Sequence, residues 1–175
     1  TLLSPANSPP QNMNSRSTLV SNVSPNSVLR EATQSDVDWM ALRLRKADED
    51  EIYANSGNDP ETALNQCLTR SVQPLTWLHD GYPAAMAGAA EVTDGVGMVW
   101  CLGTYKIAQY PKEFIRIHRV VLPMLQEQFP LLFNYVDARN KLHINYLEHF
   151  GFRIIAKHER FGFGNLPFYE FVRIA

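Results

Sequence analysis

The stretch VDARNKLHINYLEHFGFRIIAKHE, residues 136 to 159, decides the fold. It joins an apolar run to a short amphipathic helix, and the pair Gly151 and Phe152 joins that helix to a second apolar run. A helical period between two strand-like runs is typical of a domain that mixes helices with a sheet. Such a unit can belong to a working catalyst or to a scaffold that has lost its chemistry.

The sequence on both sides of this unit has the same mixed character. Strand-like and helical patterns follow one another in the order β-α-α-β-β-β-α-β-α-β-β, with no internal repeat. This order predicts an α/β fold of the α+β kind. The expected strands lie near 28–33, 74–79, 82–92, 96–105, 131–136, 152–158 and 168–174, and the expected helices near 37–53, 60–71, 111–129 and 140–150.

Local signals indicate where several of these elements begin. Ser35 or Asp36 can cap the first helix. Asp59 is a suitable N-cap for the second helix, because Pro60 follows it at the first helical position. The pair at 80–81, Asp-Gly between two apolar runs, predicts a hairpin turn.

The third helix has the strongest amphipathic pattern. Pro111 suits its first turn, whereas Pro123 in its interior predicts a kink or an early end. The apolar positions recur at helical spacing and define one buried face, formed by Phe114, Ile117, Val121, Leu125 and Phe129.

Composition predicts a single domain. The chain has 175 residues with 45% hydrophobic content, enough for one core. Sixteen Lys and Arg stand against eighteen Asp and Glu, so we expect neither a nucleic-acid site nor an anionic membrane surface as a partner. No apolar run is long enough to span a bilayer. Cys67 and Cys101 have no metal-site spacing and are interpreted as buried thiols.

The first 27 residues differ from the remainder. They contain seven Ser, five Asn and four Pro, with Arg16 as the only charge. Such a segment buries too little apolar surface to order alone, so we interpret residues 1–27 as an extended arm before a domain at 28–175. The arm can dock on another protein or lie along its own domain. Its anchors for a partner would be Leu2, Leu3, Met13, Leu19, Val20 and Val23.

The order of elements, with the opening stretch at its centre, resembles the GCN5-related N-acetyltransferase superfamily. In that superfamily a strand and the helix after it complete the cofactor cleft, and their motif is commonly written N-x-x-A-x-x-x-Y-x-x-x-G-F. Asn140, Gly151 and Phe152 fall on that spacing. His143 replaces the small residue, and Leu147 replaces the Tyr that often protonates the departing thiolate. Tyr146 is about 100° round the helix, so we expect it to point elsewhere.

The resemblance implies a central mixed, mostly antiparallel sheet flanked by helices. It also implies that the strand near Trp100 and the strand near Tyr135 run parallel and diverge to admit the pantetheine arm of acetyl-CoA. Were the cofactor bound, Leu102, Gly103, Thr104 and Asn140 would contact it. The loop after Gly103 lacks the further glycines that usually close around the pyrophosphate, and only Lys106 and Lys112 offer charge there.

Other candidate chemistry is sparse, so we expect no catalytic residue, no metal and no cofactor. The five histidines lack a metal spacing and are interpreted as structural. The acids between Asp48 and Glu51 are interpreted as a solvated helix end, with contact to a substrate amine as the other reading. No G-x-S-x-G, H-E-x-x-H or P-loop motif is present.

The run DGYPAAMAGAAEVTDGVGMVWCLGT, residues 80–104, is similar to acetyltransferase-like proteins encoded among the virion genes of short-tailed phages and prophages. This resemblance implies a virion structural or assembly protein, active in particle assembly or DNA ejection, on a catalytically inactive fold. Its partners would be portal, tail or capsid components, with several copies in the virion after synthesis in the host cytoplasm. The alternative is an active, acetyl-CoA-dependent N-acetyltransferase that modifies a protein or a small amine.

Overall fold

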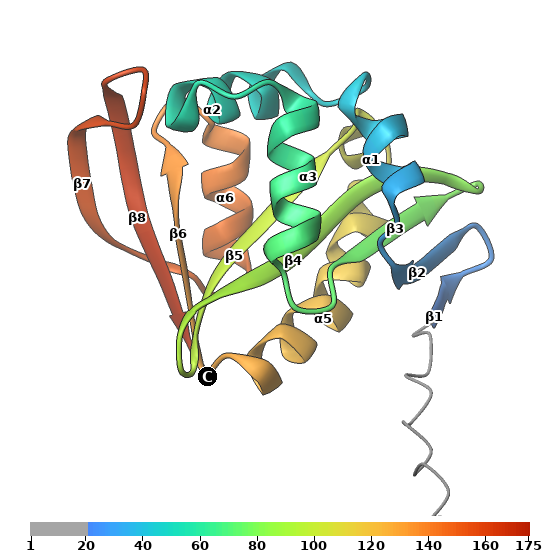
Figure 1. The fold of residues 1–175 in the computed structure, drawn as a ribbon. Helices are drawn as coiled ribbons and strands as arrows, with labels where there is room; N and C mark the ends of the chain where they lie inside the picture. Colours follow the sequence, from blue (N-terminus) through green and yellow to red (C-terminus); the bar gives the residue numbers. More distant parts are fainter. Residues whose placement is uncertain (1–20) are drawn as a thin grey trace, which may run out of the picture.

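The computed structural model describes residues 21–175, which form an eight-stranded sheet with helices on both faces (Figure 1). The strand order is β1-β2-β3-β4-β5-β6-β8-β7, and every neighbouring pair is antiparallel except β5 and β6. The predicted mixed, mostly antiparallel sheet is therefore confirmed. The strands are β1 (Ser21–Ser24), β2 (Ser27–Glu31), β3 (Leu75–His79), β4 (Tyr82–Thr93), β5 (Val96–Gly103), β6 (Leu131–Asp137), β7 (Arg153–Phe161) and β8 (Leu166–Ile174).

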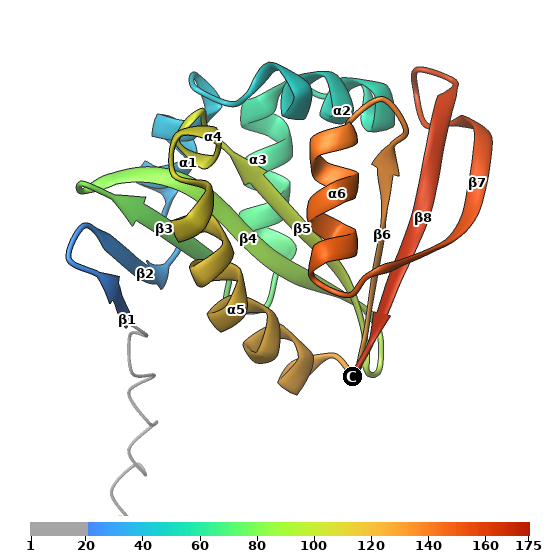
Figure 2. The ribbon, with the colours of Figure 1, turned by 180° about the vertical axis from the view of Figure 1, so that it is seen from behind.

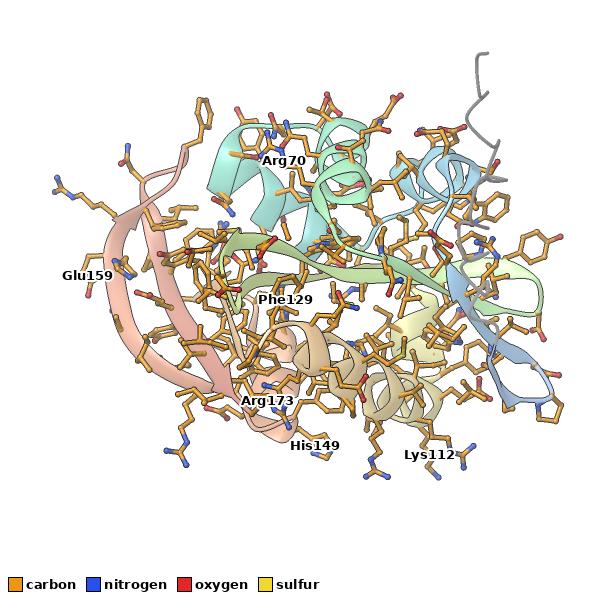
Figure 3. The ribbon with its side chains drawn as sticks, turned by 60° about the horizontal axis from the view of Figure 1, so that its bottom comes forward. Arg70, Lys112, Phe129, His149, Glu159 and Arg173 are labelled. Carbon is orange, nitrogen blue, oxygen red and sulfur yellow. The ribbon has the colours of Figure 1, made fainter. Side chains whose placement is uncertain are left out.

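Two helical layers cover the sheet. One layer contains α1 (Gln34–Ala41), α2 (Lys46–Ser56) and α3 (Pro60–Arg70), and the other contains α4 (Lys106–Gln109), α5 (Pro111–Gln128) and α6 (Lys141–His149). Figure 2 shows α5 and α6 in front of the sheet, with α2 across the end toward which β6 runs. Arg70 of α3 lies on one side of the sheet, whereas Lys112 and His149 lie on the other (Figure 3).

Each layer buries its own apolar cluster. The α5–α6 side contains the predicted face of α5, whose five side chains are all at most 5% exposed, and packs it against β-strand residues such as Trp77 and Leu132. The other side contains Val37, Met40 and Leu64 from α1 and α3, together with Met86 of β4. Because successive strand residues face opposite sides, β4 can supply Met86 to one cluster and its alanine neighbours to the other.

The predicted hairpin between β3 and β4 is confirmed. Asp80 and Gly81 form a two-residue loop in which both residues have positive φ, 51° and 79°. This is the backbone of a type I′ turn, whose twist matches that of the flanking strands. Asp59 and Pro60 also cap and begin α3 as predicted, because the Asp59 carboxylate accepts the Thr62 N–H at 2.8 Å.

The helix expected at 37–53 is wrong as a single element. It is broken into α1 and α2, because Leu44 pairs with Thr104 and the Arg45 N–H donates to the Gly103 carbonyl at 2.9 Å. The chain makes these bonds to the end of β5 in place of the helical hydrogen bonds that would continue α1. The N-cap of α1 is Thr33 rather than Ser35 or Asp36.

The early end expected at Pro123 is also wrong, because α5 continues to Gln128. Pro123 is exposed, and the residue whose carbonyl loses its helical donor, Arg119, is exposed as well. Water can therefore satisfy the carbonyl, so the helix tolerates the proline here.

The folded domain includes part of the predicted arm. Strand β1 pairs with β2, and Val23 packs against the main apolar cluster. Val23 is therefore a core contact rather than a partner anchor, and the domain begins before Val28. The other predicted anchors, Leu2, Leu3, Met13, Leu19 and Val20, lie outside the described residues.

No helix within residues 21–175 is long and apolar enough to cross a membrane. In the same range, no three His, Cys, Asp or Glu side chains are grouped so that they could hold a metal ion.

Candidate functional site

Strands β5 and β6 diverge at the centre of the sheet. Their parallel pairing joins residues 96–98 to residues 131–133, after which β5 continues to Gly103 and β6 to Asp137 unpaired with each other. Asn134 marks the point of divergence, because its Nδ2 donates to the Val99 carbonyl at 2.7 Å. The predicted divergence of this strand pair is confirmed.

The gap exposes backbone groups that a ligand can use. Strand alternation directs the N–H and C=O of Cys101 to the same side as the Val99 carbonyl, and thus into the gap. The pairing of β5 with β6 ends at Met98, so β6 offers no ladder partner to these groups of Cys101. An extended ligand in this gap would therefore find the hydrogen-bonding edge of a strand.

A cavity of about 300 Å³ occupies the gap. It reaches both helical layers, so it passes through the sheet where the strands separate. Its walls are largely apolar, with a few polar and titratable side chains among them. They include Glu51 and Asn55 of α2, Cys67 and Arg70 of α3, Cys101 and Tyr135 of the two strands, and His118, His143 and Tyr146 of α5 and α6, together with Arg45 at the start of α2.

A buried ion pair at the start of α2 joins the end of β5 through hydrogen bonds to Gly103. Asp48, only 2% exposed, accepts from Arg45 Nη2 at 2.6 Å and from the Gly103 N–H at 3.0 Å. The interpretation as a solvated helix end is therefore wrong for Asp48, whereas Asp50 is exposed and pairs with exposed Lys46. Glu51 follows Asp48 by three residues and lies on the same helical face, which turns its carboxylate toward the cavity.

Glu51 is the centre of a polar cluster between α2 and α6. Its Oε2 accepts from Asn140 Nδ2 at 3.0 Å and from the Asp137 N–H at 3.3 Å, and its Oε1 lies 3.5 Å from His143 Nδ1. Burial would lower the pKa of His143, but the nearby charge of Glu51 more than offsets that effect and raises the pKa above its ordinary value. Asn140 also caps α6 by accepting the His143 N–H at 3.3 Å.

The α5 side of the cavity contains His118, whose pKa is shifted in the opposite direction to that of His143. The ring of His118 packs between Phe114 and Phe150, with centroid distances of 4.2 and 4.9 Å. Its Nδ1 lies 3.2 Å from the Phe114 carbonyl. Burial lowers the pKa of His118 to about 4, so this imidazole is neutral at ordinary pH.

Several hydroxyl and thiol groups also reach the cavity. Tyr146 lines it beside Leu147, so the expectation that Tyr146 points elsewhere is wrong. Its ring packs edge-on against Phe114 at 5.0 Å, which holds it in this wall. Tyr135 and Cys101 line the cavity as well, and burial raises the pKa of the Cys101 thiol to about 12, so it stays protonated. The hydroxyl-bearing Tyr135 and Tyr146 and the Cys101 thiol therefore line the same cavity as Leu147.

The loop after β5 leaves few backbone N–H groups free to bind a diphosphate. Most backbone N–H groups of residues 103–110 already donate within the protein, those of Gly103 and Thr104 to Asp48 and Ala84 and those of residues 106–110 within the loop. The position over Gly103 is filled by Ile107, whose Cδ1 would lie 1.9 Å from an added Cβ. Of the four predicted cofactor contacts, Leu102 lines the cavity, whereas Gly103, Thr104 and Asn140 are not among its lining residues.

Sequence comparison finds no relative: no protein-family model and no curated protein matches the chain. Its structure is similar to solved acetyltransferases. Ard1 from Thermoplasma volcanium matches with a TM-score of 0.69 and 11% identity, over 86% of this chain and 98% of that one. A GNAT-family acetyltransferase from Streptococcus pneumoniae matches with a TM-score of 0.57 and 16% identity, over 85% and 99%.

A third similar structure contains a bound coenzyme. RimL, a ribosomal alpha-N-protein acetyltransferase in complex with coenzyme A, has a TM-score of 0.61 and 8% identity, over 89% of this chain and 98% of that one. At such identities the likeness concerns the fold. Together with the diverging strands, these matches show that the described chain has the GCN5-related N-acetyltransferase fold.

Proposed function

We propose that this protein transfers an acyl group from a thioester to an amine, with acetyl-CoA as the donor class. The observation that carries the proposal is the cavity through the sheet between β5 and β6. Because the cavity meets both helical layers, a donor and an acceptor can enter from opposite faces and meet in the gap. We therefore prefer the hypothesis of an active N-acetyltransferase over that of a catalytically inactive structural protein.

The residues present fit the acyl-pantetheine part of the donor. The Cys101 backbone would hold the arm along β5, and apolar side chains of α5 and α6 such as Val121 and Leu147 would exclude water around it. Lys106 and Lys112 would supply charge near the diphosphate. Acetyl-CoA, when bound, supplies an acetyl group activated as a thioester.

The acceptor side offers one carboxylate, Glu51, that can attract an amine, beside the cationic Arg45 and Arg70. Glu51 faces the cavity from α2. The comparison with RimL, an alpha-N-protein acetyltransferase, favours a chain terminus over a small amine. We therefore take the α-amine of a peptide as the first acceptor to test.

Incubation with acetyl-CoA and a library of peptides, read out by mass spectrometry, tests the proposal. We expect acetylated peptide N-termini, and we expect Cys101→Phe, which fills the gap, to abolish them. Ile155→Phe on exposed β7 is the matched control and should remain active. Absence of transfer to any amine, despite intact folding, would contradict the proposal.

The place of the protein in a phage particle is a separate proposal from the sequence. It assigns the arm to contacts with portal, tail or capsid proteins, and its anchors through Val20 lie outside the described residues. Deletion of residues 1–20, which leaves β1 and the core intact, should abolish incorporation into particles. Normal incorporation of the truncated protein would contradict the docking role.

A further inference from the structure

We infer that His143 is the catalytic base of the acyl transfer and that Glu51 is its positioning residue. This inference rests on the proposed function and assigns the proton transfer to a pair that joins α6 to α2. His143 precedes Leu147 by four residues and therefore lies on the same face of α6, one turn nearer to α2. A titratable ring thus stands in the cavity wall next to a leucine that cannot exchange a proton.

The geometry of the pair leaves one ring nitrogen available. Glu51 Oε1 faces His143 Nδ1 at 3.5 Å, and the His143 side chain is 21% exposed. Nδ1 has no hydrogen-bond partner within the described residues, which is typical of a catalytic contact that shortens only when substrate binds. With Nδ1 held toward the carboxylate, Nε2 is the atom left to exchange a proton with a substrate.

Glu51 is itself held in place by groups that do not titrate near neutrality. The Asn140 amide and the Asp137 backbone N–H both donate to its Oε2, which leaves Oε1 for the imidazole. The α2 helix that carries Glu51 is fixed in turn by Asp48 and Arg45. A carboxylate so constrained orients a histidine ring and stabilises its protonated form.

The surroundings of His143 support a base. The titratable groups that face it are Glu51, with Asp48 and Arg45, from the α2 side, His118 from α5, Cys101 from β5 and Tyr135 from β6. His118 is neutral because it is buried, and the Cys101 thiol is protonated. Glu51 is therefore the group whose charge acts directly on His143, and it also attracts a substrate ammonium.

The proton balance of the reaction follows from this arrangement. The substrate ammonium loses one proton to His143 Nε2, and the amine nitrogen then forms a bond to the thioester carbonyl carbon as the C–S bond breaks. The nitrogen loses a second proton, which ends on the departing sulfur. The products are an amide and a thiol, and His143 returns its proton to water.

Three measurements on the full chain test the assignment. The first is the titration of the His143 ring by NMR in the unliganded protein: Glu51→Gln should lower its pKa, since the charge that raises it is removed. The second is turnover of His143→Gln, where we expect kcat to fall about 10²- to 10⁴-fold with acetyl-CoA affinity unchanged. His149→Gln, exposed on the same helix, is the matched control and should keep full activity.

The third is the pH profile of kcat/KM, which a merely structural role for Glu51 would not shift. The rise in activity with pH should move to lower pH in Glu51→Gln, together with a lower maximum. An unchanged His143 pKa in Glu51→Gln, or full activity in His143→Gln, would overturn this assignment and leave the proposed function intact. An inactive wild-type protein that binds acetyl-CoA would overturn both.

Discussion

The two ends of the cavity use their polar groups in different ways. At the α2–α6 end, Glu51 accepts two hydrogen bonds and still faces His143 across the cavity wall. At the loop end, residues 103–110 direct most of their backbone N–H groups back into the protein. Under the proposed function, the α2–α6 end would receive the acceptor and transfer its proton, whereas the loop end would offer the donor a slot rather than an anion cradle. Donor binding would then depend on the gap more than on the loop.

The largest expected effect comes from the ion pair that fixes α2. Asp48→Asn leaves the Arg45 guanidinium buried without its carboxylate, and removing one partner of such a pair costs about 3–5 kcal/mol. Unfolding in urea measures the loss. Asp50→Asn, which breaks the exposed pair with Lys46, is the control and should change stability by less than about 1 kcal/mol. Equal effects of the two substitutions would contradict the distinction.

A second effect, on pH dependence, concerns the α5 side of the cavity. The folded pKa of His118 lies at about 4, below its ordinary value, so between these values the unfolded chain binds a proton that the folded protein does not. Stability should therefore fall as the pH drops from about 6.5 to about 4, by about 3 kcal/mol for this group. His118→Phe should remove that part of the dependence, as measured by urea unfolding at several pH values. Parallel curves for both proteins would contradict it.

A smaller effect tests the closed loop. Gly103→Ala places a Cβ against buried Ile107, and overpacking of this kind costs about 1–3 kcal/mol. In a protein that already carries Ile107→Ala, Gly103→Ala should lower the stability by less than it does in the wild-type protein, because the added methyl then has space. Thermal unfolding of the three variants measures this coupling. Strictly additive losses would show that the two side chains do not compete for the space over β5.

The smallest expected effect concerns the donor itself. A diphosphate held by two charge-assisted hydrogen bonds would gain about 3–6 kcal/mol, or more than 100-fold in affinity. With most loop amides already bonded, we expect acetyl-CoA and acetyl-pantetheine to bind with dissociation constants within about tenfold of each other. Calorimetric titration of both compounds decides this. A hundredfold preference for acetyl-CoA would show that the loop reopens to bind the diphosphate.

The sequence predicts what depends on short-range patterns. The apolar face of α5 and the Asp80 and Gly81 turn follow from spacing, the parallel strand pair follows from the family resemblance, and the structure confirms all three. The break between α1 and α2 does not follow, because it depends on bonds from Leu44 and Arg45 to residues almost 60 positions later.

The candidate site was only partly predictable for the same reason. Glu51 meets Asn140 across 89 residues of sequence, a contact that no local pattern encodes. The spacing of Arg45, Asp48 and Glu51 at intervals of three does place all three on one helical face, and that signal could have separated them from the solvated acids around them. The sequence shows that His143 replaces a small residue of the motif, but it does not show that Glu51 lies beside His143.

The central claim is that an acyl thioester binds in the gap between β5 and β6. A crystal structure of the protein with acetyl-CoA tests this most directly. The account predicts the pantetheine arm between the two strands, hydrogen-bonded to the backbone of Cys101, with the thioester near His143. A coenzyme bound elsewhere, or strands that pair beyond Met98 with no ligand between them, would contradict it.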